Sequence, residues 1–398
     1  MKLASTDACT GCMACVDICP RNVLGLEIDR YGYFKVAVQN ISNCIDCGLC
    51  TKVCPVLNIP KNENISSHPY AAWDEFKPRR KRSASGGVFA AIATIFLENN
   101  CIVYGASIDG FEIIHKRITD INDLHYLQGS KYQHSNMTGV YRLVKKDLSD
   151  GRIVLFSGLS CQIAGLYSFL GSRRHSNNLY TIDTVCGGVS TMLPMLNLKS
   201  TGLFQGINSF RDKENGWQSV GFKYSLKMVR TDGNIEDFGL NNIVLDTFSS
   251  KLYKRASCLN CQFTGFHRLS DCTIADFWGD KRYVDQHHDG VSVMILHNTR
   301  LISFIEKSRL VYDPIKWSDF IQNNPNVYWS HQPYIKFFPS RKKGLEALRI
   351  KQNEIAKKQI NIHSIPGLFL RLYLKINGLH RFFSYYIKIK CLDKNEKC

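Results

Sequence analysis

The sequence predicts a chain in three parts: a small cysteine-rich α+β domain, a larger α/β core and a basic helical C-terminal tail. Three observations support this order. Eight of the sixteen cysteines lie within the first 54 residues. A strand–helix–strand pattern follows between residues 152 and 185, and residues 340–390 carry 12 lysines and arginines against two acidic residues. A length of 398 residues suits two or three domains.

Composition narrows the class of protein. Apolar residues make up 44% of the chain, which is enough for a packed core and excludes wholesale disorder. The longest apolar stretch, residues 86–97, has 12 residues, whereas a membrane-spanning helix needs about 20. The first residues lack the apolar segment of a secretory signal. We therefore expect a cytoplasmic protein without transmembrane helices, with a net charge of +17.

The first eight cysteines form two copies of one pattern, C-x2-C-x2-C-x3-C-P. The copies are Cys9, Cys12, Cys15, Cys19 and Pro20, and then Cys44, Cys47, Cys50, Cys54 and Pro55. In a reduced compartment, dense cysteines indicate metal or redox chemistry rather than disulfides. Three closely spaced cysteines bind one [4Fe-4S] cluster, and the fourth binds the other cluster. We therefore expect Cys54 to join the first triplet and Cys19 the second.

Zinc is the alternative for these cysteines, but it favours separated C-x2-C pairs with tetrahedral geometry. Gly11 and Gly48 are expected to let backbone amides approach the cluster sulfides. Over these residues the chain resembles bacterial dicluster ferredoxins. A domain of this kind carries electrons, so the rest of the chain must supply a donor or an acceptor.

Residues 1–60 are expected to form this first domain, residues 61–72 a polar linker, and residues 73–300 the core. Within the core, the apolar residues 88–98 predict a helix that ends at Asn99 and Asn100. Strands are predicted at 101–108, 152–157 and 179–185, with a helix at 161–170. Strand, helix and strand in that order predict a parallel βαβ unit.

The loop before the helix at 88–98 is a candidate phosphate site. Ser85, Gly86 and Gly87 are small, and free N–H groups at a helix start attract anions. The alternative is a simple N-cap by Ser85. The preceding basic run, residues 77–82, favours an anion, although such a run is also typical of a solvated loop.

Further sequence motifs occur in the order found in one known family. They are KRSASGG at 81–87, LQGSKYQHS at 127–135, VLFSGLSCQIAGL at 154–166, IDTVCGG at 182–188, FRDKENGW at 210–217, and CLNCQF with RLSDCTIADFWGD at 258–280. With the N-terminal repeat they span residues 1–300, and the chain resembles the beta-subunit family of coenzyme F420 hydrogenases and dehydrogenases. This resemblance implies FAD, which exchanges a hydride with a two-electron carrier and single electrons with Fe–S clusters.

The resemblance also implies roles for single residues. Ser85, Gly86 and Gly87 should line the FAD phosphates, and Ser130 and Lys131 should approach the flavin or its diphosphate. Ser157, Gly158 and Gln162 lie where a parallel strand ends, which is where ligands bind in open α/β sheets. Lys131 and Gln162 are the candidate catalytic residues. The alternatives are a surface lysine and a helix-capping glutamine.

A second cysteine set lies in the core. Cys161 and Cys186 follow two strands of one sheet, and Cys258 with Cys261 forms a C-x2-C pair. Four thiolates suit a third [4Fe-4S] cluster, which the family carries. Zinc and unligated buried thiols are the alternatives. Cys101 and Cys272 are expected in the core.

Some residues depart from the family pattern. Ser160, Gly187 and Ala275 stand where proline, histidine and glycine are common, which leaves the substrate open. His115, His134 and His267 are expected to be structural, with substrate protonation as the alternative. Asp271 and Asp276 are better placed to supply a substrate proton, and the alternative is that they only orient Arg268 or a backbone amide.

The C-terminal region, residues 301–398, is expected to be basic and helical. Helical patterns at 341–358 and 365–390 interleave aromatic and basic residues, which is typical of segments that contact anionic lipid or acidic partners. A packed helical tail is the alternative. No nucleic-acid-binding module is present in the sequence, so no nucleic-acid partner is expected.

The complete expectation is an α+β ferredoxin-like dicluster domain, an α/β flavin-binding core and a basic helical C-terminal tail. The expected function is an FAD- and Fe–S-dependent oxidoreductase that passes electrons between a deazaflavin- or NAD(P)H-like carrier and [4Fe-4S] clusters. Its partner is a redox protein or a small carrier, in a complex or an oligomer. The alternatives are an electron-carrier or partner-binding subunit without flavin, and a zinc-stabilised nucleic-acid binder.

Overall fold

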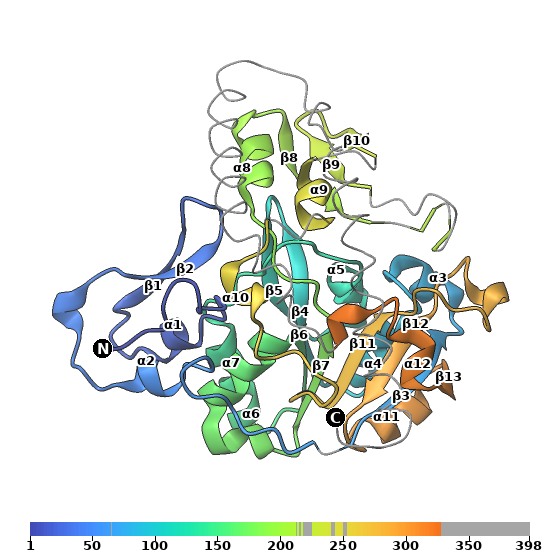
Figure 1. Ribbon diagram of the computed structural model, residues 1–398, viewed down its shortest axis with the longest axis horizontal. Coiled ribbons are helices and arrows are strands. Elements are labelled where there is room, and N and C mark those ends of the chain that lie inside the picture. Colours follow the sequence, from blue (N-terminus) through green and yellow to red (C-terminus); the bar gives the residue numbers. More distant parts are fainter. Residues whose placement is uncertain are drawn as a thin grey trace.

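A mixed β-sheet forms the centre of the protein, in a computed structural model that describes residues 1–64, 66–211, 213–214, 216–217, 225–239, 243–249 and 253–327 (Figure 1). Within these residues the sheet has eight strands in the order β13-β3-β12-β11-β7-β6-β4-β5. The strands are β3 (His68–Asp74), β4 (Ile102–Asp109), β5 (Glu112–Ile118), β6 (Val154–Leu159), β7 (Leu179–Thr184), β11 (Cys272–Asp276), β12 (Ser292–Leu296) and β13 (Leu310–Pro314).

The middle of this sheet is parallel. Strand β6 pairs in parallel with both β4 and β7, and β7 pairs in parallel with β11. Antiparallel strands complete both edges. The predicted βαβ unit is present, because helix α7 (Ser160–Leu170) connects β6 to β7.

Helices cover both faces of the sheet. Helix α4 (Val88–Glu98), which has the bounds expected from the sequence, packs with α11 (Ile302–Lys307) on one face. Helices α6 (Val140–Ser149) and α7 pack on the other. Because successive strand residues point to opposite faces, Val103 of β4 joins the first core and Tyr104 joins the second.

The N-terminal domain packs on the face that carries α6 and α7. It contains α1 (Ala14–Ile18), the antiparallel pair β1 (Leu24–Ile28) and β2 (Phe34–Val38), and α2 (Leu49–Lys52). Its buried residues Met13, Val16 and Phe34 belong to the same apolar core as α7. The Asp17 carboxylate accepts the backbone N–H groups of Gly139 and Tyr141 at 2.6 and 3.0 Å and so caps α6.

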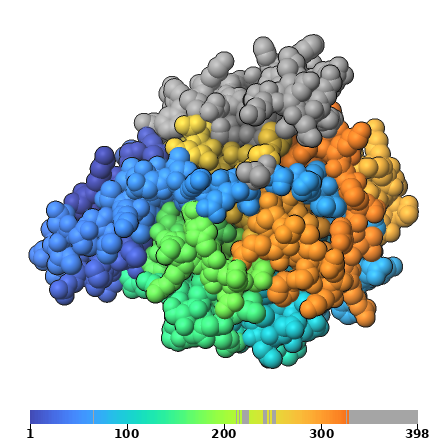
Figure 2. All heavy atoms as spheres, turned by 90° about the horizontal axis from the view of Figure 1, so that it is seen from below, coloured from blue at the N-terminus to red at the C-terminus, as the bar shows by residue number. Residues whose placement is uncertain are grey.

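A small antiparallel sheet forms a further layer, with order β10-β9-β8. Its strands are β8 (Phe204–Ser209), β9 (Lys227–Arg230) and β10 (Ile235–Asp237), which pack with α8 (Leu193–Ser200) and α9 (Ile243–Ser249). The remaining short helices are α3 (Lys77–Arg82), α5 (Leu124–Leu127), α10 (Ala256–Leu259) and α12 (Trp317–Phe320), with 3-10 turns at Ile41–Asn43, Ile121–Asp123, Gly171–His175, Val284–Gln286 and Pro325–Val327. Figure 2 shows the N-terminal domain projecting at one side of the molecule.

The core extends beyond the expected boundaries of 73–300. Strand β3 begins inside the expected linker, and β13 lies in the expected tail region. Both strands belong to the main sheet: β3 pairs with β12 on one side and with β13 on the other. The basic run at 77–82 is helix α3 rather than a loop, and buried Arg80 donates to Gly290 O and Gln286 O.

The helices expected at 341–358 and 365–390 lie outside the described residues. None of the helices in the described part of the chain combines the length and apolar character that a membrane crossing requires.

Candidate functional site

The first cysteine group contains the first triplet and Cys54. Burial raises the pKa of Cys12 to about 12, and the nearby thiolates of Cys9 and Cys54 add to this effect. The pKa of Cys15 is raised in the same way by burial and by Cys12, Cys9 and Cys54. The structure therefore brings Cys54 to the first triplet, as the sequence pattern predicts. Iron bound to these thiols would supply the positive charge that thiolates need.

The second group lies further out in the N-terminal domain. Cys19, Cys44, Cys47 and Cys50 line one small hollow. The Cys19 sulfur accepts a hydrogen bond from the backbone N–H of Val23 at 3.3 Å. Cys47 is exposed, so this group lies at the surface of the domain.

The two cysteine loops share a local backbone conformation. Gly11 and Met13 in the first loop have φ of 73° and 67°, and the equivalent Asp46 and Gly48 have φ of 49° and 71°. Left-handed residues at these positions turn backbone N–H groups into a concave, anion-binding shape. Met13 and Asp46 adopt it at a steric cost that glycine avoids. The sequence indicated only the two glycines.

A third cysteine group lies in the core. Cys161 is in the first turn of α7, Cys186 follows β7, and Cys258 and Cys261 come from α10 and the loop after it. Burial raises the pKa of Cys161 well above its usual value, and Cys261, Cys186 and Cys258 add to this effect. Backbone N–H groups of Gly188 and Val189 donate to the sulfurs of Cys186 and Cys258, both at 3.3 Å.

Buried polar atoms without a hydrogen-bond partner lie beside two of these groups. Both ring nitrogens of His134 lack partners near the first group, and Ser257 Oγ lacks one beside Cys258. Such atoms are rare in native proteins, and a bound ion, an ordered water or a redox role is among the explanations for them. The donor atoms present therefore fit iron–sulfur clusters. Across the described ranges, no group of three or more His, Cys, Asp or Glu side chains is arranged to hold a single metal ion.

The first and third groups meet across helix α7. A Cβ on Gly165 would lie 3.1 Å from the Cys12 sulfur, so only glycine allows this close approach. Cys161 lies one turn earlier on the same helix, and Cys12 is among the groups that raise its pKa. Arg255, just before α10, donates to the backbone oxygens of Cys9 and Phe34, both at 2.6 Å. The N-terminal domain is thus held against the core cysteines.

A cavity of about 570 Å³ opens where the parallel strands end. This is the position at which open α/β sheets bind ligands, and the volume is in the range of cofactor pockets. Its wall includes predicted flavin-site residues, namely Ser85, Gly87, Ser130, Lys131, Ser157, Gly158 and Gln162. Cys186 lines the same cavity, so the core cysteine group adjoins it.

Gly86 is not on this cavity wall. Its N–H donates to Ser292 Oγ at 2.9 Å, and its carbonyl accepts the N–H of Asp74 at 2.7 Å. A Cβ on Gly86 would clash with the backbone oxygen of Ala72. The residue is glycine because it packs against β3 and β12. Ser85 is not an N-cap, since its hydroxyl donates to Val291 O at 2.8 Å and Gly87 precedes α4.

Lys131 is half-buried at the edge of the cavity. Its ammonium donates to the backbone oxygens of Tyr126 and Gln128 at 3.1 and 2.7 Å. Burial lowers the pKa of Lys131 to about 7, so its charge changes near neutral pH.

Gln162 belongs to a polar network on the cavity floor. Its Oε1 accepts the N–H of Leu159 at 2.8 Å, and its Nε2 donates to Ser135 Oγ at 2.9 Å. Ser135 also contacts His115 Nδ1 at 2.9 Å, and His115 Nε2 lies 2.7 Å from Ser157 O. Burial lowers the pKa of His115 to about 4, so the ring is neutral. Gln162 thus positions neighbours and caps α7.

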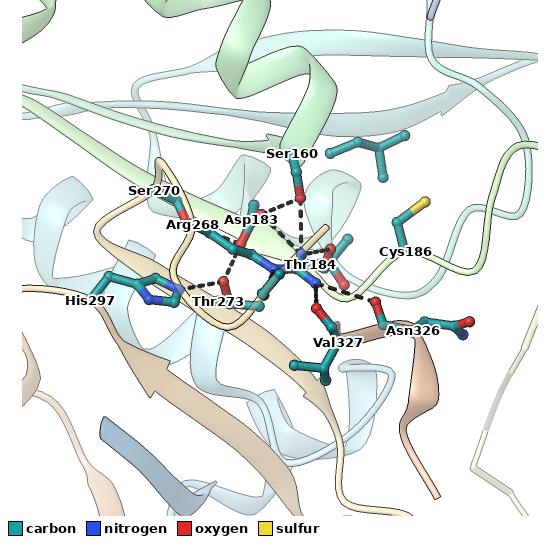
Figure 3. A network of polar contacts seen from close by, with 12 residues as sticks. Ser160, Asp183, Thr184, Cys186, Arg268, Ser270, Thr273, His297, Asn326 and Val327 are labelled. Atoms are coloured by element: carbon teal, nitrogen blue, oxygen red, sulfur yellow. Dashed lines mark hydrogen bonds and ion pairs between the residues drawn. The ribbon is translucent and has the colours of Figure 1, made fainter. Parts of the chain in front are cut away.

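A second network surrounds Asp183, which is 1% exposed and lines the cavity (Figure 3). Arg268 pairs with Asp183 at 3.2 Å and also donates to Ser160 Oγ at 2.9 Å. The hydroxyl groups of Ser160 and Thr273 donate to the same carboxylate. Sequence reasoning missed Asp183. Its one local signal is a polar residue near the end of a buried parallel strand.

Asp271 and Asp276 had the alternative role of orienting Arg268 or a backbone amide, and neither pairs with Arg268. Asp271 accepts the N–H of Thr181 at 2.7 Å, which is the backbone role that was the alternative. Asp276 forms two contacts of 3.1 Å with Arg211. Of the family departures, Gly187 and Ala275 line the cavity and Ser160 bonds Asp183.

A basic hollow of about 760 Å³ adjoins the cavity. Both are lined by Ser83, Ala84, Gln128 and Gly129. The hollow also carries Lys81, Arg82, His125, Arg211 and Lys213. Exposed Lys81 and Arg82 favour anionic ligands there. Arg211 already pairs with Asp276, and the Lys213 ammonium donates to the backbone oxygens of Arg80 and Ser85.

Comparison with known proteins matches two parts of the chain. A family model described as a 4Fe-4S dicluster domain matches residues 8–58. A model for the C terminus of the coenzyme F420 hydrogenase/dehydrogenase beta subunit matches residues 151–310. A solved chain from the xenon-derivatised F420-reducing [NiFe] hydrogenase complex of Methanosarcina barkeri is 14% identical, with a TM-score of 0.43 over 73% of this chain and 94% of that one. No curated protein matches.

Proposed function

Because the chain belongs to the coenzyme F420 hydrogenase/dehydrogenase beta-subunit family and carries an N-terminal 4Fe-4S dicluster domain, we propose that it is an FAD- and Fe–S-dependent oxidoreductase. It passes electrons between a two-electron carrier, deazaflavin- or NAD(P)H-like, and [4Fe-4S] clusters. The observation that carries this proposal is the shared wall of the cavity. Residues of the predicted flavin site and Cys186 of the core cysteine group line the same space.

Bound FAD would supply the exchange between a hydride and single electrons. Ser85, Gly87, Ser130, Ser157 and Gly158 would line it, and Lys131 would provide positive charge beside it. The basic hollow next to the cavity would orient the anionic part of the cofactor or of the two-electron carrier. The polar network of Gln162, Ser135 and His115 would hold the cavity floor in place.

Three clusters would form the electron path. Cys161, Cys186, Cys258 and Cys261 would hold the innermost cluster, next to the cavity. The cluster of Cys9, Cys12, Cys15 and Cys54 would follow, since Cys12 meets α7 at Gly165. The cluster of Cys19, Cys44, Cys47 and Cys50 would be outermost, where Cys47 is exposed.

The outer cluster would exchange electrons with a redox partner protein. Exposed Ile45 lines the same small hollow as these four cysteines and would contact such a partner. We further propose a cytoplasmic location and peripheral contact with an anionic membrane through the basic residues of 340–390.

The test is cofactor content followed by reduction. Protein purified anaerobically should contain flavin as well as iron and sulfide, and one of NADH, NADPH or reduced F420, tested in parallel, should bleach the flavin absorbance. The competing function is an electron-carrier or partner-binding subunit without its own flavin chemistry. It predicts Fe–S absorbance alone and no response to any of the three carriers.

A further inference from the structure

A continuous hydrogen-bonded chain runs from the surface to the cavity. Exposed His267 contacts Ser67 Oγ through Nδ1 at 2.9 Å, and Ser67 Oγ contacts His297 Nδ1 at 2.7 Å. His297 Nε2 lies 2.8 Å from Thr273 Oγ1, which donates to the carboxylate of Asp183. Figure 3 shows the inner part of the chain, from His297 through Thr273 to Asp183.

The chemistry of the inner end fixes the direction of every hydrogen bond. The Asp183 carboxylate accepts from Thr273, so the Thr273 oxygen must accept from His297 Nε2–H. Burial lowers the pKa of His297 to about 4, so the ring is neutral and its Nδ1 accepts from Ser67. Ser67 therefore accepts from His267 Nδ1–H. All donors point from solvent towards the cavity.

Of the five residues in this hydrogen-bonded chain, Asp183 is the one that lines the cavity. His267 is the exposed end of the hydrogen-bonded chain. The links between them are 2% exposed His297, fully buried Thr273 and partly buried Ser67. Asp183, Arg268 and His267 are the charged or titratable groups that act on His297. Buried hydrogen-bonded chains of this kind can move protons without moving side chains through the core.

We propose that this chain is a proton path between solvent at His267 and the cavity at Asp183. The proposal rests on the proposed function. Reduction of a two-electron carrier in the cavity takes up two electrons and one proton as a hydride, and a deazaflavin takes up one further proton at a ring nitrogen. Two reduced clusters each lose one electron, and the proton enters from solvent through His267, Ser67, His297, Thr273 and Asp183. Electron flow in the opposite direction releases the proton along the same path.

The two decisive variants each remove one hydroxyl group that donates a hydrogen bond to the Asp183 carboxylate. Thr273→Val cuts the chain and keeps the side-chain shape. Ser270→Ala also removes a donor to Asp183, at 3.0 Å, but leaves the path from His297 intact. Proton uptake is measured on the anaerobic holoprotein after flash photoreduction, with a pH-indicator dye in weakly buffered solution. We expect Thr273→Val to slow uptake about 100-fold, the effect typical of losing one proton-transfer group, and Ser270→Ala to change it about twofold or less.

A rescue experiment tests the outer end. His267→Ala should slow proton uptake, and added imidazole should restore it, because the exposed position can be reached from solvent. Imidazole should not restore Thr273→Val, whose gap is buried. Equal rates in Thr273→Val and Ser270→Ala, or an unchanged rate in His267→Ala without imidazole, would overturn the proposal.

The tautomer of His297 tests the direction of the hydrogen bonds without requiring turnover. In oxidised protein labelled with ¹⁵N histidine, the chain requires His297 to carry its proton on Nε2, in the wild type and in Ser270→Ala. The Nδ1 tautomer, or a doubly protonated ring, contradicts the path. If the wild type holds no flavin and takes up no protons, the proposed function fails, and the His297 tautomer still decides whether the chain is oriented as inferred.

Discussion

Lys131 should control how anionic ligand binding depends on pH. Its pKa is lowered to about 7 by burial, so the ammonium is charged below this pH and neutral above it. The affinity for FAD should therefore fall as pH rises through 7. Lys131→Met should bind FAD weakly at all pH values, whereas Lys131→Arg, which stays charged, should lose the pH dependence. Flavin fluorescence titrations between pH 6 and 9 measure this. A wild-type pH profile retained in Lys131→Met contradicts the assignment.

His134 should tune the cluster of the first cysteine group. The ring is 1% exposed, neither nitrogen has a partner, and a Cβ on Gly11 would lie 3.0 Å from its Cε1. Burial lowers the pKa of His134 to about 3, so the neutral ring has one N–H to donate. Hydrogen bonds to cluster sulfurs set reduction potentials, and a donor favours the more negative, reduced state.

His134→Phe should make that cluster harder to reduce. A tenfold change in the equilibrium corresponds to about 59 mV for one electron, and we expect a negative shift of this order in an EPR-monitored redox titration. Equal potentials in wild type and His134→Phe, at unchanged iron content, would exclude the role.

The sequence predicted site residues correctly only where their pattern lies within a short stretch of the chain. The cysteine groups of the N-terminal domain follow from spacing, because each triplet lies within one loop. Asp183 and Arg255 act through partners 85 and 246 residues away in sequence, namely Arg268 and Cys9, and no short motif contains both members. Gly86 was predicted to line a phosphate site because it lies in a loop of small residues. It packs instead against β12, which lies more than 200 residues later in the sequence.

At the scale of elements, helix α7 is the contact between the two cysteine-rich parts. Gly165→Val would place its Cβ 2.8 Å from Tyr141 Oη and 3.1 Å from the Cys12 sulfur. Overpacking of this kind costs about 1–3 kcal/mol of folding free energy. We expect the variant to lose stability in urea and to slow reduction of the N-terminal clusters by the flavin.

Ser168→Val is the control for this variant. It introduces the same β-branched side chain on the same helix, at a half-buried position. If both variants reduce their N-terminal clusters at the same rate, close contact at Gly165 is not part of the electron path.

The elements themselves were predicted well where periodicity is strong. Helix α4 and the βαβ unit of β6, α7 and β7 follow from apolar runs bounded by polar turns. The contributions of β3, β12 and β13 to the sheet were not predicted, because their pairing joins segments more than 200 residues apart. The short helix α3 was not predicted, because its run of basic residues is typical of a solvated loop. In the structure Arg79 pairs with Asp74, and Arg80 donates to Gly290 O.

On the scale of the whole molecule, the N-terminal domain is part of the core rather than an appended carrier. Residues of both share one apolar cluster, and Asp17 caps α6. The sequence suggested separate domains joined by a linker, because contacts between domains leave no local pattern. This arrangement keeps the first cysteine group beside α7.

The basic residues of 340–390 should bind anionic membranes in a salt-dependent way. Each lysine or arginine near such a surface contributes about 1 kcal/mol, and salt screens the attraction over about 10 Å at 0.1 M. Full-length protein should sediment with phosphatidylserine vesicles at low salt. Truncation after Pro339 should abolish this while reduction by the carrier continues. Full-length protein that ignores the vesicles contradicts the membrane contact.

We propose that electrons pass between the cavity and the N-terminal clusters through the core cysteine group. The most direct measurement is anaerobic reduction by the active carrier, with flavin absorbance and cluster EPR followed together in wild type and Cys258→Ser. The wild type should bleach its flavin and then develop the EPR signals of reduced clusters. Cys258→Ser should contain about four fewer irons and bleach its flavin while the N-terminal clusters stay oxidised. Unchanged iron content and normal reduction of those clusters in Cys258→Ser would contradict it.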